Sequence, residues 1–568
     1  MNKNRLLKAY LGLRRRGIVI LIGLLFIGFT IQSQTTFRNP FDHPILLSGG
    51  FGELRTNHFH SGLDFKTKGQ TGLPVHAVQK GYVSRISVNA WGYGNALYLD
   101  HPDGTTTVYG HLSRFNPLLA AYVKQKQYEK EQFKLDITLP PDSFVFGKGE
   151  VIAWSGNTGS SAGPHLHFEV RNTESEEVLD PLEYFRDRVN DHKPPRLKGV
   201  KFCPVEGEGV LNHSSNQRKM NVISAGGHTL KIRESLTGWG KIGLAIKAYD
   251  YMDNTANTYG VRLISLHVDG EEIYYSDINR FAFSDNHAVN SYVDYPEWRN
   301  HRSFYIRTFV EPGNHLPFVY AKHRGYIQIK EERTYQITCC LEDLKGNATV
   351  LKFEIKGKKQ AIVPRDTTGR TLLRWNELNR FGTKGLRLTI PRGNLYDDCW
   401  MSLRTHRDTT DWSDTYTLND VPVALDKSAT LSLWLHQDKL LNKAQYGLIL
   451  LWKGRSYWQP SHYKKHRVIG EITHLGTYKI GVDTVPPRIR PLSLASGLLR
   501  FQITDNLSGV ESFRGEINGH YVLFTMDKRM RISYRMDAKR LKHGLQHLVL
   551  TVVDACGNES VYKRTFNW

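Results

Sequence analysis

The sequence contains little cysteine for its length. Only five cysteines occur among 568 residues, too few for a disulfide scaffold. They are Cys203, Cys339, Cys340, Cys399 and Cys556. None forms a CxxC pair, which excludes a thiolate zinc knuckle and a thioredoxin motif. Any metal must therefore be held by histidine and carboxylate side chains.

Two further motifs and one kind of segment are missing. There is no HExxH, so the glutamate base of the helical zinc proteases is absent. There is no GxxxxGK[ST], so the glycine-rich pieces "WGYGN" and "SGNTGSSAG" are interpreted as turns lining a groove rather than a phosphate loop. The apolar run at 17–31 has 15 residues, whereas a spanning helix needs about 20.

The beginning of the chain predicts export. Residues 1–34 combine six lysines and arginines, no acidic residue, the short apolar run and Ser33 near a possible cleavage point. This pattern is typical of a secretory signal peptide. An uncleaved N-terminal anchor is the alternative. Either way, we expect the protein in the periplasm or the cell envelope.

Composition predicts a globular and basic protein. Apolar residues make up 40% of the chain and aromatic residues 11%, too many for a disordered protein. The net charge of +21 falls to +15 once the six basic residues at 1–34 are set aside. A basic excess suits an anionic polymer or anionic lipid as well as nucleic acid. Export argues against nucleic acid, and we predict no nucleic-acid partner.

The layout is that of an all-β multidomain protein. Short alternating segments separated by glycine, such as "GYVSRISV" and "HLHFEVR", predict antiparallel sheets. After the signal or anchor at 1–34, we predict one N-terminal domain and three further modules. Their bounds are 35–190, then 194–358 (β-sandwich-like), 359–484 (β-rich) and 485–568 (β-sandwich-like).

A weak internal repeat supports the β-sandwich (Ig-like) modules. Pro194-Pro195-Arg196 and Pro486-Pro487-Arg488 each follow a polar linker and open a strand. The stretch from "AYD" at 248–250 to Gly270 parallels that from "ITD" at 503–505 to Gly519. Each unit closes on a D-x-x-G-N sequence, at 343–347 and 554–558. Strand and turn spacing of this kind is typical of sandwich modules.

One insertion in the N-terminal domain predicts a helix. The stretch 116–133 is rich in helix formers and begins with an Asn116 cap followed by Pro117. We predict a short amphipathic helix here. It is either a lid over a site or an element of packing.

Histidines concentrate in three segments of the same domain: "HSGLD" at 60–64, "YGHL" at 109–112 and "GPHLHF" at 163–168. His165 and His167 share one face of a strand, about 6.6 Å apart. His60 and Asp64 would lie about 13 Å apart in an extended strand, so they can share a metal only if the chain bends at Gly62.

Two imidazoles and one carboxylate leave zinc a fourth position for water, which is the catalytic arrangement. His58, His76 and His101 are expected to be bystanders.

The ordered segments "FGELR", "HSGLDF", "GLPVHAVQKGYV", "GYGNALYLDHPDGTTTVYGHLS", "SGNTGSSAGPHLHFEVR" and "DPLEYF" carry a family resemblance. Across residues 48–186 the chain resembles the lysostaphin-type (LytM-domain) zinc metallopeptidases, which cut peptide cross-links of peptidoglycan. His76 and the long insertion at 115–146 depart from the family pattern.

The resemblance implies one Zn²⁺ per chain, with His60, Asp64 and His167 as its ligands. It assigns His111 and His165 as catalytic histidines that do not bind the metal. A neutral imidazole at one of them is the natural proton acceptor, and the other can donate to the developing oxyanion. The sequence leaves open which does which.

The resemblance also implies partners. Peptidoglycan stem peptides are the expected substrate, with the cross-link between D-alanine and diaminopimelate as target if the source is Gram-negative. We expect the later modules to contact envelope proteins. The alternative functions are a non-catalytic regulator with a LytM fold and an envelope-binding scaffold.

Overall fold

The computed structural model describes residues 37–568 except residue 496. The predicted signal peptide or anchor at 1–34 lies outside the described residues. In the part that is described, none of the helices combines the length and the apolar character needed to cross a membrane.

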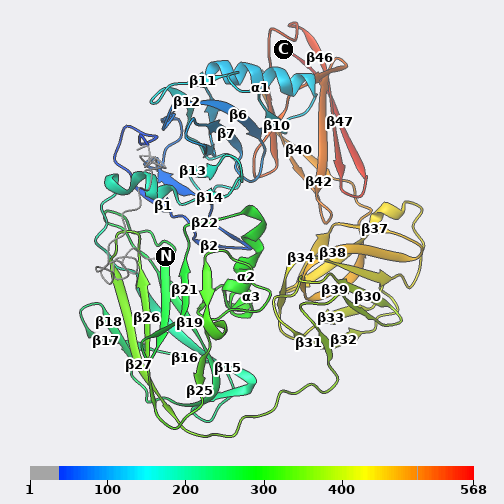
Figure 1. Ribbon diagram of the computed structural model, residues 1–568. Coiled ribbons are helices and arrows are strands. Elements are labelled where there is room, and N and C mark those ends of the chain that lie inside the picture. Colours follow the sequence, from blue (N-terminus) through cyan, green and yellow to red (C-terminus); the bar gives the residue numbers. More distant parts are fainter. Residues whose placement is uncertain (1–36, 496) are drawn as a thin grey trace, which may run out of the picture. The chain divides into compact units, whose positions relative to one another are not determined.

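Strands dominate the described chain, as Figure 1 shows, and the prediction of an all-β multidomain fold is confirmed. The N-terminal region is built on one large sheet in which the strand order is β1-β4-β13-β8-β7-β6-β10, with neighbours antiparallel. In that order the strands are Leu47–Gly49, Leu63–Lys66, His165–Asn172, Thr105–Gly110, Asn95–Asp100, Gly81–Val88 and Leu135–Thr138. A second sheet has the order β5-β12-β9, with bounds Pro74–His76, Val151–Trp154 and Arg114–Phe115.

Strand β13 shows how the sequence divides the two faces of the large sheet. Leu166, Phe168 and Val170 are fully buried in the hydrophobic core of this region. The alternate positions carry His165, His167, Glu169 and Arg171, because successive side chains of a strand point to opposite faces. One face of β13 therefore packs in the hydrophobic core, and the other face carries the side chains that are available for chemistry.

The predicted helix is present as α1, Pro117–Glu129. The Asn116 side chain accepts from the backbone N–H of Leu118, as expected of a cap. The helix ends earlier than the predicted stretch, since Glu131 has a left-handed φ of 47°. Its buried stripe includes a polar side chain, Gln127, while Leu118 is 70% exposed, so the amphipathic pattern is weak.

The next region contains a 12-stranded sheet whose main order is β16-β15-β19-β27-β26-β20-β21-β24. These strands are Arg218–Met220, Arg196–Leu211, Thr237–Tyr249, Ala348–Gly357, Thr334–Glu342, Leu263–Val268, Glu271–Asp277 and Val319–Ala321. Two short helices, α2 (Val289–Tyr292) and α3 (Tyr295–His301), accompany it and were not predicted. Strand β22 (Arg280–Phe281) pairs with β14 (Val178–Leu179) of the N-terminal sheet.

The last two regions each contain two larger sheets around a shared hydrophobic cluster. The first has the orders β29-β30-β34-β38-β37 and β32-β33-β39-β35-β36. The second has β40-β41-β45-β44 and β43-β42-β46-β47. In these orders the strands of the first region are Asn379–Gly382, Leu386–Ile390, Val423–Trp434, Arg467–Leu475 and Ser461–Tyr463, then Leu403–His406, Thr415–Leu418, Thr477–Val482, Tyr446–Trp452 and Arg455–Gln459. Those of the second are Arg488–Ala495, Leu498–Thr504, Arg531–Arg535 and Thr525–Met526, then His520–Val522, Val510–Ile517, Leu545–Asp554 and Glu559–Asn567.

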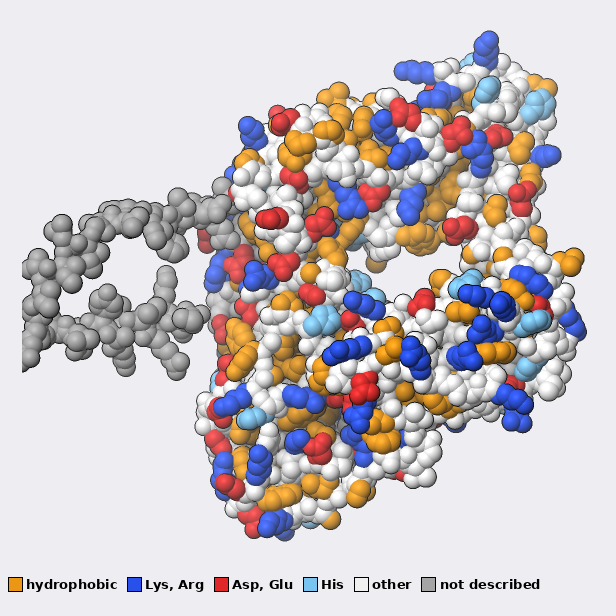
Figure 2. Space-filling view, turned by 45° about the vertical axis from the view of Figure 1, so that its right-hand side comes forward, with side chains coloured by type: hydrophobic (Ala, Val, Ile, Leu, Met, Phe, Trp, Pro, Cys, Tyr) orange, Lys and Arg blue, Asp and Glu red, His pale blue; other side chains and the backbone are white. Residues whose placement is uncertain are grey.

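Charged side chains of both signs are mixed over the visible face of the molecule, as Figure 2 shows. On this face the basic side chains are thus interspersed with acidic side chains. The five cysteines are all free.

Candidate metal centre

The adjacent strands β4 and β13 bring two of the predicted ligands together. In the register of β4 and β13, His167 lies opposite Asp64, and in the register of β13 and β8 it lies opposite Gly110. His60 follows the two-residue strand β3 (His58–Phe59). Residues far apart in sequence therefore converge at one end of the large sheet.

Gly62 lets the chain pass between β3 and β4, but for a different reason from the one predicted. Its φ is not in the left-handed region. Instead, a Cβ at this position would lie 2.2 Å from the backbone oxygen of Phe168. Only glycine allows this close approach to β13, which carries His167.

The donor atoms of His60, Asp64 and His167 face one another. The Nε2 atom of His60 lies 3.1 Å from Asp64 Oδ1 and 3.1 Å from His167 Nδ1. The His167 Nδ1 atom lies 3.0 Å from Asp64 Oδ1. All three residues are buried, with exposed fractions of 8% or less.

The other nitrogen of each imidazole is already engaged. His60 Nδ1 donates to the carbonyl oxygen of Gly50 at 2.7 Å, and His167 Nε2 donates to Glu169 Oε1 at 2.9 Å. When the rings are neutral, as metal binding requires, each therefore directs an unprotonated nitrogen at the other and at Asp64. Three electron-pair donors this close are compatible with a cation between them, and two imidazoles with one carboxylate are a donor set that zinc accepts.

Sequence reasoning missed a buried network behind His167. Glu169 is fully buried, and its carboxylate also accepts from the Tyr93 hydroxyl at 2.6 Å and from the Arg171 guanidinium at 2.6 and 2.8 Å. Such carboxylate–histidine pairs fix the tautomer and orientation of a metal ligand. The alternation of HLHFEVR was the available signal, because Glu169 and Arg171 share a face with His167.

Burial and neighbouring groups together determine the pKa values of Asp64 and His167 in this network. Burial alone would raise the pKa of Asp64, but the neighbouring histidines lower it well below its usual range. Burial disfavours a charged His167, yet hydrogen bonds to Asp64 and Glu169 outweigh it and raise the pKa of His167 to about 9. Without a metal, His167 therefore binds a second proton, and this positive charge takes the place of the cation.

His111 and His165 lie next to the three donors. Their ring centroids are 4.7 Å apart, and the His111 ring is 5.8 Å from that of His167. Burial, together with the charges of His167 and His165, lowers the pKa of His111 to about 3, so this imidazole is neutral. His111 also has a left-handed φ of 59°, an uncommon backbone conformation for a residue other than glycine.

The two histidines differ in what their nitrogens face. His111 Nδ1 donates to the Thr158 carbonyl oxygen at 2.8 Å, which leaves Nε2 without a proton. His165 Nδ1 faces the Gly163 carbonyl oxygen at 2.8 Å, and its Nε2 lies 3.4 Å from Asp64 Oδ1. Both nitrogens of His165 thus face acceptors.

All five predicted site residues line one cavity of about 670 Å³. Its walls also contain His58, Tyr93 and residues 160–164. Phe283 and Asn286 of the following region contribute as well, which local sequence patterns could not reveal. His76 and His101 do not line it, and their rings bond to Gly149 and to Lys80 and Thr107 respectively.

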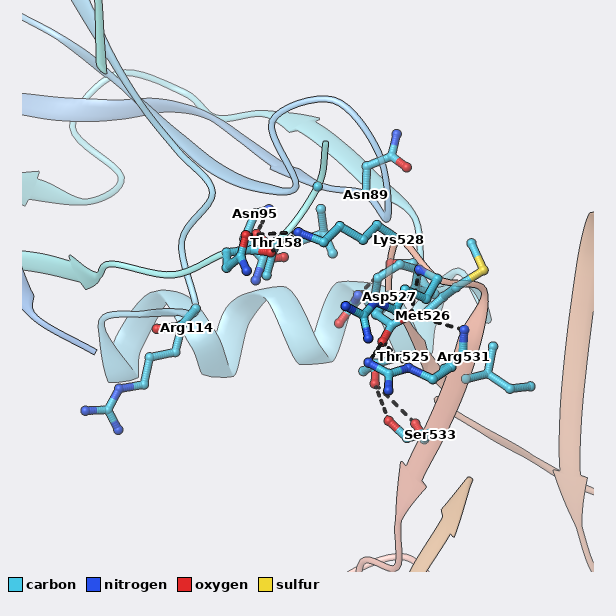
Figure 3. Close-up of a pocket in the computed structure, with 18 of the residues that line it drawn as sticks. Asn89, Asn95, Arg114, Thr158, Thr525, Met526, Asp527, Lys528, Arg531 and Ser533 are labelled. Carbon is cyan, nitrogen blue, oxygen red and sulfur yellow. Dashed lines mark hydrogen bonds and ion pairs between the residues drawn. The ribbon is translucent and has the colours of Figure 1, made fainter. Parts of the chain in front are cut away.

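A larger cavity of about 840 Å³ lies between α1 and the last module, and Figure 3 shows part of its lining. Lys528 reaches across it and donates to Asn157 Oδ1 at 2.9 Å and to the Ser161 carbonyl oxygen. None of the five predicted site residues is among the described residues that line this cavity. The loop 157–161 connects this larger cavity to the metal centre.

Comparisons with known proteins agree with this geometry. Residues 58–128 match peptidase family M23, and residues 370–483 match the Zu5-like domain. The chain is 33% identical over 149 residues to "DD-carboxypeptidase/endopeptidase Mpg" of Neisseria meningitidis, covering 25% of this chain and 26% of that protein. It is 32% identical over 111 residues to "Peptidoglycan DD-endopeptidase ShyB" of Vibrio cholerae, covering 20% of each.

Among solved structures, the catalytic domain of lysostaphin from Staphylococcus simulans matches with 26% identity and a TM-score of 0.19. The match covers 25% of this chain and 92% of that one. The curated relatives are thus matched over about a quarter of their length or less. The N-terminal region carries a LytM-type domain. Its family is peptidase family M23, and the predicted resemblance is confirmed.

Proposed function

We propose that this protein is an exported zinc metalloendopeptidase that hydrolyses peptide cross-links of peptidoglycan. The observation that carries the proposal is the convergence of His60 Nε2, Asp64 Oδ1 and His167 Nδ1 within 3.1 Å, in a domain that matches peptidase family M23. His60, Asp64 and His167 would hold one Zn²⁺. When bound, zinc lowers the pKa of a water ligand to about 7 and polarises a carbonyl group.

The neighbouring histidines have separate roles in this proposal. His111 is neutral and presents an unprotonated Nε2, so it accepts the proton from the attacking water. Both nitrogens of His165 face acceptors, so it carries the proton that is donated to the developing oxyanion. The sequence leaves this division open, and the different hydrogen-bond partners of the two rings support it.

The substrate class follows from the relatives. ShyB is named as a peptidoglycan DD-endopeptidase and Mpg as a DD-carboxypeptidase/endopeptidase, and they match 20% and 25% of this chain. We extend this to stem peptides of peptidoglycan in the periplasm or envelope. The later modules are proposed to position the enzyme through envelope proteins.

Zinc content and the release of uncross-linked muropeptides from purified sacculi test the proposal. The purified chain should contain about one zinc ion and release muropeptides. His60→Ala should lose both. His165→Ala should keep the zinc and lose the release, because it removes a proton donor and not a ligand.

His58→Ala is the matched control, since His58 lines the same cavity and its Nδ1 faces the Thr56 carbonyl oxygen rather than one of the three donor atoms. It should keep both zinc and activity. Zinc without release in the unaltered chain would contradict the proposal and favour the non-catalytic regulator. Recovery of the native chain from the cytoplasm alone would contradict export.

A further inference from the structure

Among the described residues, two further clusters of ligating side chains occur outside the peptidase domain, and they repeat each other. One contains Asp191, Asp250 and Asp343, and the other contains Asp483, Asp505 and Asp554. In each cluster the carboxylate oxygens lie within 4.8 Å of one another. The first aspartate comes from the linker before Pro-Pro-Arg, the second ends "AYD" or "ITD", and the third opens D-x-x-G-N.

The first cluster is deeply buried and one of its oxygens has no partner. Asp191, Asp250 and Asp343 have exposed fractions of 8%, 8% and 6%. Asp343 Oδ1 accepts from the backbone N–H of Lys345 and Asn347. Asp250 Oδ1 is buried without any hydrogen-bond partner. A buried carboxylate oxygen in this state is costly unless something else satisfies it.

The first cluster differs from most buried carboxylates in its lack of ion pairs among the described residues. Within residues 37–495 and 497–568, none of its carboxylates forms an ion pair with lysine or arginine. The nearby Lys193 directs Nζ to the carbonyl oxygen of Met252 instead. The three carboxylates therefore lie close together without an ion-pair partner among the described residues.

The second cluster repeats the hydrogen bonds of the first. Asn347 Nδ2 donates to Asp343 Oδ2 at 2.7 Å and to the Asp191 carbonyl oxygen at 3.1 Å. In the other copy, Asn558 Nδ2 donates to Asp554 Oδ2 at 2.7 Å and to the Asp483 carbonyl oxygen at 3.1 Å. As in Asp250, the Oδ1 atom of Asp505 is buried without a partner. The same oxygen is left unsatisfied twice.

We propose that each aspartate triad binds one calcium ion, which ties the linker aspartate to the module that follows it. Calcium takes six to eight oxygen ligands at about 2.4 Å, so oxygens on opposite sides of it lie about 4.8 Å apart. The carboxylate oxygens of each triad lie within this distance of one another, so one calcium ion can contact all three. Magnesium usually keeps several of its waters and zinc prefers nitrogen and sulfur donors, so a site made of carboxylates favours calcium.

Calcium titration of the full-length, zinc-loaded chain tests the proposal. Extracellular modules bind calcium with dissociation constants of about 10⁻⁴–10⁻³ M, so titration to about 5 mM is sufficient. We expect two calcium ions per chain by calorimetry and a calcium-dependent rise in Tm. Asp250→Asn and Asp505→Asn should each leave one ion, and the double variant none.

Stability separates a metal site from a merely buried acid. Without calcium, Asp250→Asn should have a Tm equal to or above that of the unaltered chain, because it removes a buried carboxylate that lacks an ion-pair partner. With calcium, its Tm should be lower. Asp366→Asn, at an exposed position, is the matched control and should bind two ions. No binding at 5 mM, or two ions retained by the double variant, would overturn the proposal.

Discussion

The peptidase domain and the modules both gather buried acidic groups, but they satisfy them differently. Around Asp64 the partners are imidazole nitrogens, and behind His167 the carboxylate of Glu169 is held by Arg171. In the aspartate triads the partners are backbone N–H groups and an asparagine, and one oxygen is left over. The first arrangement suits a borderline cation beside an open cavity, and the second suits a hard cation in a structural joint.

The Glu169→Gln variant tests how much the first arrangement depends on its buried carboxylate. The amide keeps an acceptor for His167 Nε2 but removes the charge that Arg171 faces. We expect zinc affinity to fall by about 10–100-fold, as for other changes behind a metal-binding histidine. Competition with a fluorescent zinc chelator measures it.

The exposed Glu174→Gln is the control for that substitution and should leave zinc affinity unchanged. Calcium binding should be unaffected in both variants if the two kinds of cluster are independent. Equal zinc affinity in Glu169→Gln and the unaltered chain would show that the network only supports the fold.

A pH titration of stability addresses the neutral state of His111. Its pKa is lowered to about 3 by burial and by the charges of His167 and His165, whereas an unfolded histidine titrates near 6.5. Between these values the unfolded chain binds the extra proton, so this residue's contribution to stability falls as the pH falls. At pH 5 the loss is about 2 kcal/mol.

The isosteric variant His111→Gln lacks this proton. In zinc-free protein, the Tm of the unaltered chain should therefore fall relative to that of His111→Gln between pH 7 and pH 5. Contributions from the other histidines are common to both proteins and cancel in the difference. A difference that is constant with pH would mean that the pKa of His111 is the same in the folded and the unfolded chain.

Local patterns sufficed for much of the fold. The segment "GYVSRISV" coincides with β6 and "HLHFEVR" lies within β13, because alternation and flanking glycines are local properties. The Asn116 cap located the start of α1, whereas its end depended on the backbone of Glu131. The short helices α2 and α3 gave no comparable signal.

Local sequence patterns likewise predicted only part of the candidate site. The i and i+2 spacing placed His165 and His167 on one face of β13, as the structure has them. The partners Tyr93 and Phe283 come from distant segments and depend on how strands and modules pack, so no local pattern indicates them. The aspartate triads were visible only as a repeat, since burial and the unsatisfied oxygens are three-dimensional properties.

The smallest expected effect concerns the contact between the module that contains the second triad and the peptidase domain. Lys528 donates to Asn157 Oδ1 and to the Ser161 carbonyl oxygen, and Ser161 lines the metal cavity. Because a single partly exposed lysine contributes less than about 1 kcal/mol, Lys528→Ala should lower kcat/KM for muropeptide release by less than roughly fivefold. The change should be in KM rather than in kcat, because the loop 157–161 borders the cavity and takes no part in proton transfer.

Lys528→Arg, which keeps the charge, should restore most of this loss, and Lys539→Ala at an exposed position should have no effect. If calcium lowers KM in the unaltered chain and not in Lys528→Ala, the second triad acts on the metal centre through this contact. If calcium changes only the Tm, the triads and the metal centre share a chain without being coupled. A large loss of kcat in Lys528→Ala would contradict both outcomes, because it would place the lysine in the chemistry itself.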